Sequence, residues 1–89
     1  MNTTELRCES CHEPHGGKIG DPCDEACQYS RLVLAIESGR YCVEIADHGD
    51  HFKATGLIGE NLSRDFGVRD YATVKNAERA AAKWLEKNA

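Results

Sequence analysis

Four cysteines near the start of this chain have the spacing of a metal site. They form two close pairs, with two residues between the members of the first pair and three between those of the second: Cys8, Cys11, Cys23 and Cys27. Short local loops of this kind present thiolates to one ion, and such shells typically hold tetrahedral Zn2+. We therefore expect one structural zinc bound by four sulfurs, with His12 or His15 as substitutes for one cysteine.

A predicted helix that begins at Pro22 would carry the second cysteine pair. Asp21 suits the N-cap of this helix, and proline is favoured at the first helical position. Cys23 and Cys27 then lie four residues apart on one helix face, where the positive end of the helix dipole favours thiolates. This arrangement resembles the treble-clef and zinc-ribbon class of structural zinc sites. The resemblance covers residues 8–27 and implies a zinc-knuckle-like head with the first pair on a turn.

Two other interpretations of the cysteines stay open. Residues 8–12, Cys-Glu-Ser-Cys-His, match the attachment motif of c-type haem, in which two thioethers hold the porphyrin and the histidine binds iron. We favour zinc because few aromatic residues are present to enclose a porphyrin and a second cysteine pair lies nearby. The remaining alternative is a set of unligated thiols or disulfides.

Other clusters of polar residues are weaker candidates for chemistry. Residues 47–51, Asp-His-Gly-Asp-His, offer ligands for a surface metal or an acid–base pair, but a two-strand tip lacks the rigid support that such sites need. We interpret this segment as a polar hairpin turn. Cys42 lies in an alternating segment and is interpreted as a semi-buried thiol rather than a nucleophile. Because phosphate-binding loops and nucleophile motifs are absent from the sequence, we expect no enzymatic activity.

Hydrophobic spacing predicts one small α+β domain over residues 1–89, with a cysteine-rich head at 1–27 and a body at 28–89. We expect a helix at 22–38, ended by Gly39 in the left-handed conformation. The body is then predicted as a strand at 40–46, its hairpin partner at 51–58, a loop at 59–64 and a short third strand at 66–71. This order describes an antiparallel hairpin or three-stranded meander.

The end of the chain predicts an amphipathic helix that packs on this sheet. Thr73 suits its N-cap, and apolar residues recur at helical spacing: Val74, Ala77, Ala81, Trp84 and Leu85. Four cations repeat at every fourth position outside this apolar face, and they are candidate partner-binding residues: Lys75, Arg79, Lys83 and Lys87. These four residues are named the basic stripe. The alternative interpretation is an ordinary solvated helix face.

Composition and net charge indicate the cellular compartment and the class of binding partner to expect. No apolar run approaches the roughly 20 residues of a membrane span, and no hydrophobic leader opens the sequence. We therefore expect a cytoplasmic protein, in which cysteines bind metal more often than they form disulfides. The formal net charge of −4 disfavours nonspecific coating of nucleic acid, so a protein partner is favoured.

These features predict a small non-enzymatic zinc-binding protein that acts by binding a macromolecule. In size and charge alone, the chain resembles phage- and mobile-element-encoded inhibitors of nucleic-acid-handling complexes, including anti-CRISPR proteins. One alternative is a zinc-finger-like nucleic-acid-binding module that uses the basic stripe. Another is a c-type haem redox protein.

Overall fold

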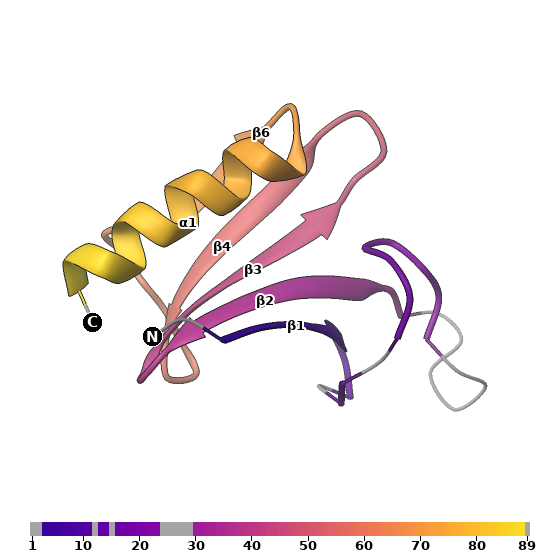
Figure 1. The fold of residues 1–89 in the computed structure, drawn as a ribbon, viewed down its shortest axis with the longest axis horizontal. Coiled ribbons are helices and arrows are strands. Elements are labelled where there is room, and N and C mark those ends of the chain that lie inside the picture. The colour runs from indigo at the N-terminus through magenta and orange to yellow at the C-terminus, as the bar shows by residue number, and fades with distance from the viewer. Residues whose placement is uncertain (1–2, 12, 15, 24–29, 89) are drawn as a thin grey trace.

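The described residues form an antiparallel sheet of six strands with one C-terminal helix packed on one face (Figure 1). The computed structural model describes residues 3–11, 13–14, 16–23 and 30–88. Strands β1 to β5 follow one another across the sheet, and β6 also pairs with β4. The elements are β1 (Thr3–Cys8), β2 (Leu32–Ser38), β3 (Tyr41–Asp47), β4 (Phe52–Ile58), β5 (Asn61–Leu62), β6 (Val68–Tyr71) and α1 (Val74–Asn88). The predicted α+β class is confirmed.

The helix predicted at 22–38 is wrong over residues 32–38, which form β2 between β1 and β3. Residues on both faces of this strand are at most 5% exposed: Leu32, Val33, Ala35 and Ile36. A strand that is buried on both faces has a nearly continuous apolar run, and over a short window this run cannot be told from helical spacing. Residues 24–29 of the predicted helix lie outside the described residues.

Tight glycine turns join successive strands of the sheet. Gly39 has a φ of 61°, in the left-handed region that the sequence predicted for it. The pairing of Ser38 with Tyr41 shows, however, that this glycine closes a two-residue hairpin turn instead of ending a helix. Gly59, with a φ of 63°, makes the equivalent turn between β4 and β5. The predicted loop at 59–64 therefore contains a short strand.

The remaining predictions for the body are confirmed. Strands β3 and β4 form the predicted hairpin, in register from Tyr41 opposite Ile58 to Asp47 opposite Phe52. The short strand expected within 66–71 is β6, which pairs with β4. Sequence analysis did not predict β1, which pairs with β2 along its whole length and so joins part of the cysteine-rich head to the sheet.

Helix α1 begins where the sequence predicted. The hydroxyl of Thr73 accepts a hydrogen bond of 3.2 Å from the backbone N–H of Asn76, which is the bond expected of an N-cap. The buried residues of the helix pack against Ile36, Val43, Ile45, Ala54 and Phe66 of the body: Ala77, Ala81, Trp84 and Leu85. Within the described part of the chain, no helix is long and apolar enough to cross a membrane.

The alternation of side chains divides β1 between the two faces of the sheet. Helix α1 contacts β2, β3, β4 and β6. The described loop residues between β1 and β2 lie past the strand ends, where β1 stops and β2 starts, away from α1 (Figure 1). The cross-strand pairing of Leu6 with Leu34 and of Cys8 with Leu32 places these residues on the helix side, whereas Arg7 points to the opposite, open face. The neighbouring residues Arg7 and Cys8 of this edge strand therefore face opposite sides of the sheet.

Candidate metal centre

The structure brings three of the four predicted cysteine ligands together at the end of β1. The Sγ atoms of Cys8, Cys11 and Cys23 lie within 4.8 Å of one another, and those of Cys11 and Cys23 are 4.0 Å apart. A tetrahedral ion with metal–sulfur bonds of about 2.3 Å separates its sulfurs by about 3.8 Å. These three cysteines are therefore close enough to hold a metal ion. Cys27, His12 and His15 lie outside the described residues.

Backbone hydrogen bonds fix the loops that carry these cysteines. The N–H of Cys8 donates to the carbonyl of Glu13 at 3.2 Å, which turns the chain back at the end of β1. The N–H of Cys23 donates to the carbonyl of Ser30 at 2.9 Å, just before β2. Because the first contact lies at the end of β1 and the second just before β2 begins, these two strands position the cluster.

Cys23 does not lie in the first turn of a helix, so this part of the prediction is wrong. Pro22 forms an isolated antiparallel bridge with Arg31, and the Cys23–Ser30 hydrogen bond continues this extended pairing. Proline fits such an edge position because its missing N–H is not needed there. The knuckle-and-helix head is therefore not confirmed; residues 24–29, which would continue the predicted helix, lie outside the described residues.

Backbone N–H groups stabilise a thiolate at Cys8. The N–H groups of Cys11 and Ser10 donate to Cys8 Sγ at 3.4 and 3.3 Å. These bonds, with that from Cys11 the strongest influence, lower the pKa of Cys8 to about 6, although burial acts in the opposite direction. Cys8 is therefore mainly a thiolate at neutral pH, which is the form that binds metal.

The three cysteines differ in their access to solvent. Cys8 is fully buried and Cys23 is 8% exposed, and both pack with Leu32 in a small apolar cluster beside the main core. Cys11 is exposed. The site thus has a closed inner side and one accessible sulfur.

The segment 47–51 forms the predicted hairpin turn. The N–H of His48 donates to the carbonyl of His51 at 2.9 Å, and the two rings stack with centroids 5.3 Å apart. His51 Nδ1 lies 2.6 Å from Asp50 Oδ1, and this hydrogen bond lowers the pKa of the Asp50 carboxyl. Among the described residues, only the cysteine cluster brings at least three ligand atoms close enough to share one ion. The interpretation as a turn is therefore favoured.

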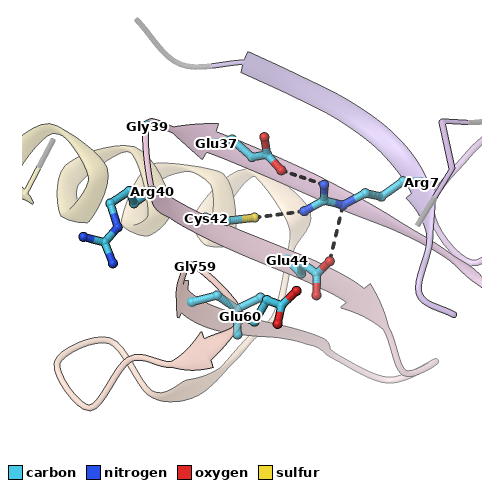
Figure 2. Close-up of a pocket in the computed structure, with 9 residues that line it drawn as sticks. Arg7, Glu37, Gly39, Arg40, Cys42, Glu44, Gly59 and Glu60 are labelled. Carbon is cyan, nitrogen blue, oxygen red and sulfur yellow. Dashed lines mark hydrogen bonds and ion pairs between the residues drawn. The ribbon is translucent and has the colours of Figure 1, made fainter. Parts of the chain in front are cut away.

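Sequence analysis missed a charged network around Arg7 on the open face (Figure 2). Its Nη1 donates to Glu37 Oε1 at 2.6 Å, and its Nε lies 3.4 Å from Glu44 Oε2. Its Nη2 donates to Cys42 Sγ at 3.2 Å. These residues and Glu60 line a hollow of about 490 Å³. The sequence signal for this network is the charged pair Glu5 and Arg7 on either side of Leu6 in β1. This pattern predicts the network only once the pairing of β1 with β2 is known.

Cys42 is a buried thiol, 7% exposed, where its alternating position predicted a semi-buried one. Burial raises its pKa to about 11, against the opposing effect of Arg7. Glu44 and Glu37 also raise the pKa, because their negative charges disfavour a thiolate. Cys42 is therefore a neutral thiol at physiological pH, which does not suit a nucleophile.

All four members of the basic stripe lie on exposed positions of α1: Lys75, Arg79, Lys83 and Lys87. No ion pair joins any of them to an acidic residue in the described part of the chain. The stripe is thus accessible to a partner.

Comparison with known proteins finds no relative of this chain. No family model matches the chain, and no curated protein or solved structure matches it. The function is therefore inferred from the geometry of the sites alone.

Proposed function

We propose that this protein is a small zinc-binding protein without catalytic activity, in which the metal ties the cysteine loops to the sheet and the surface binds a macromolecular partner. The observation that carries the proposal is the convergence of Cys8, Cys11 and Cys23 within 4.8 Å. Sulfur ligands at these distances favour Zn2+, and Cys27, or alternatively His12 or His15, supplies the fourth ligand.

The buried inner side of the site supports a structural role for the metal. A zinc ion with four protein ligands has no open coordination position for a water molecule or a substrate. Cys8 belongs to the sheet, whereas Cys11 and Cys23 belong to the loops before β2. An ion bound by all three restricts the loops relative to the sheet, and its binding free energy contributes to folding.

Native mass spectrometry combined with elemental analysis tests this proposal. The protein purified under reducing conditions is expected to carry about one zinc per chain, as a closed tetrahedral site requires. A visible absorption spectrum tests the haem alternative in the same sample, because zinc proteins are colourless. A chain that takes up no zinc under these conditions would contradict the proposal.

The partner is proposed to be a protein. The net charge of −4 supports a protein surface over nonspecific binding to nucleic acid. Inhibition of a nucleic-acid-handling complex, as by phage-encoded inhibitors, stays a prediction that no comparison supports. Co-purification with such a complex and its block at equimolar amounts would favour this role. Rapid turnover of a small substrate by the purified protein would count against any non-enzymatic role.

The exposure of the basic stripe supports a second candidate function, a nucleic-acid-binding module. Each phosphate that a cation neutralises releases counterions, so such binding weakens steeply as salt rises. Replacing Arg79 and Lys83 by glutamate is expected to abolish binding to a DNA or RNA duplex in a fluorescence anisotropy titration. Replacing Arg40, an exposed arginine far from α1 in sequence, is the matched control. Binding that does not respond to salt would rule this candidate out.

A further inference from the structure

The three clustered cysteines differ both in their exposure to solvent and in how firmly their backbone is held. Cys8 is fully buried, its backbone is paired with Leu32 in the sheet, and its Sγ accepts two backbone hydrogen bonds. Cys11 and Cys23 lie outside the strands, in the loops on either side of the cluster. Cys11 is the exposed member of the three. An oxidant in solution therefore reaches Cys11 first.

We propose that Cys11 and Cys23 are a redox modification site, at which a peroxide joins them in a reversible disulfide and thereby expels the metal. This inference rests on the proposed function, since it concerns the regulation of the same site. The cluster then reports on the oxidation state of its surroundings as well as holding the loops in place.

The geometry favours this pair of sulfurs. Cys11 Sγ and Cys23 Sγ are 4.0 Å apart, so a bond of about 2.05 Å requires them to approach by about 2 Å. Both residues lie outside the strands of the sheet, and Cys23 keeps one backbone hydrogen bond, to Ser30, so they adjust at a lower cost than a residue of the fully paired strand β1. Cys8 is held by the ladder between β1 and β2, and its sulfur is shielded from solvent. We therefore assign the disulfide to the two loop cysteines.

The reaction is an ordinary two-electron thiol oxidation. The Cys11 thiolate attacks one oxygen of hydrogen peroxide, a sulfur–oxygen bond forms, the oxygen–oxygen bond breaks, and hydroxide leaves. The Cys23 thiolate then attacks the Cys11 sulfur, the disulfide forms, and a second hydroxide leaves. Two protons from solvent convert both hydroxides to water. The two sulfurs supply both electrons, so the zinc ion keeps its charge and is released because two of its ligands are lost.

Reduction restores the site by the reverse exchange. A dithiol reductant attacks the disulfide, forms its own disulfide and returns both cysteines to the thiolate form, which binds zinc again. Through both steps Cys8 stays reduced on β1, where it provides a fixed ligand for reassembly.

The experiment treats the zinc-loaded, reduced protein with increasing hydrogen peroxide. Released zinc is measured with a chromogenic chelator, and disulfides are mapped by differential alkylation and peptide mass spectrometry. We expect release of about one zinc per chain together with a Cys11–Cys23 disulfide, and recovery of bound zinc after addition of dithiothreitol and zinc. The Cys42→Ala variant is the matched control and is expected to release zinc with the same dependence on peroxide.

The outcomes separate this inference from the proposed function. If the reduced protein never takes up zinc, both are wrong. If it binds zinc but retains it after peroxide treatment, or if the disulfide contains Cys8, Cys27 or Cys42 instead of the assigned pair, only the redox inference is wrong. Because the mapping uses the unmodified chain, the result does not depend on the folding of a cysteine variant.

Discussion

The cysteine cluster and the Arg7 network lie on opposite sides of the same edge strand, and each contains a buried cysteine. Hydrogen bonds from the backbone of Cys11 and Ser10 lower the pKa of Cys8 to about 6. Cys42 also accepts a hydrogen bond, from a fully charged guanidinium, yet burial raises its pKa to about 11. A nearby positive charge therefore does not by itself produce a thiolate.

The difference lies first in burial, which is the largest influence on Cys42 and raises its pKa. Arg7 is also paired with Glu37 and Glu44, whose negative charges raise the pKa of Cys42 further and offset the charge of the arginine. Peptide N–H groups carry no counter-ion, so their effect on Cys8 is not cancelled in this way. The comparison predicts that the stability of the cluster depends on the proposed metal and that the stability of the open face depends on its ion pairs. The two contributions are expected to be independent.

The largest expected effect is that of removing a metal ligand. The Cys23→Ser variant is expected to lose its bound zinc and about 3 kcal/mol or more of unfolding free energy, because metal binding and folding are coupled. For a domain of this size, such a loss lowers the melting temperature by roughly 10 to 25 °C. Calorimetry with parallel metal analysis measures both. The Cys42→Ser variant should keep its zinc; an equal loss of zinc in both variants would break the comparison.

The next effect is that of removing the central cation of the open face. The Arg7→Met variant leaves the partly buried carboxylates of Glu37 and Glu44 without their partner, which costs about 2 kcal/mol in chemical denaturation. The zinc content is expected to stay unchanged. Arg40→Met, at an exposed position that lines the same hollow, is the matched control with an effect of about 0.5 kcal/mol or less. Loss of zinc from Arg7→Met would show that the two regions are not independent.

A smaller effect should appear in the pH dependence of the metal-free protein. The pKa of Cys8 is about 6 in the folded chain and 9.0 in an unperturbed thiol. Between pH 6 and pH 9 the Cys8 thiol is protonated in the unfolded state but not in the folded state. The unfolding free energy therefore rises with pH over this range, and the contribution of Cys8 is complete above about pH 9. Denaturation of the chelator-treated protein over this range should show a shallower rise in Cys8→Ser. Identical slopes would contradict the assigned thiolate.

The smallest effect has the opposite sign and belongs to Cys42. Its pKa is about 11 in the folded chain, above the unperturbed 9.0, so the folded state now keeps the proton longer. The unfolding free energy therefore falls as pH rises from about 9 to about 11. The difference between the unmodified chain and Cys42→Ala isolates this contribution from other groups that titrate there. A fall of the same size in both would refute the raised pKa.

Local signals in the sequence predicted the elements that depend on local physics. The N-cap at Thr73, the hairpin between β3 and β4 and the left-handed Gly39 were all predicted from neighbouring residues. The error at β2 arose because a strand that is buried on both faces by distant partners has no period-2 pattern. β1 was missed because its pairing with β2, about thirty residues further on, leaves little trace in its own polar residues.

The candidate site was predicted in part for the same reason. The spacing of four cysteines predicted that they share one ion, and the structure places three of them together, Cys8, Cys11 and Cys23. The fourth, Cys27, lies outside the described residues. The support around Cys23 comes from its pairing with Ser30, which no motif contains. The Arg7 network joins residues from β1, β2 and β3 and was invisible before the register of the sheet was known.

The position of Arg7 next to Cys8 has a consequence for the alignment of β1. A slip of β1 by one residue relative to β2 would turn the thiol toward the open face and the guanidinium toward the apolar side. Either change is unfavourable by itself, since it separates the sulfurs of the cluster or buries a charge away from its carboxylates. Arg7 and Cys8 therefore both favour one alignment of β1, although β1 is an edge strand with few apolar residues. Arg7 does so through its ion pairs, and Cys8 does so through the sulfur cluster.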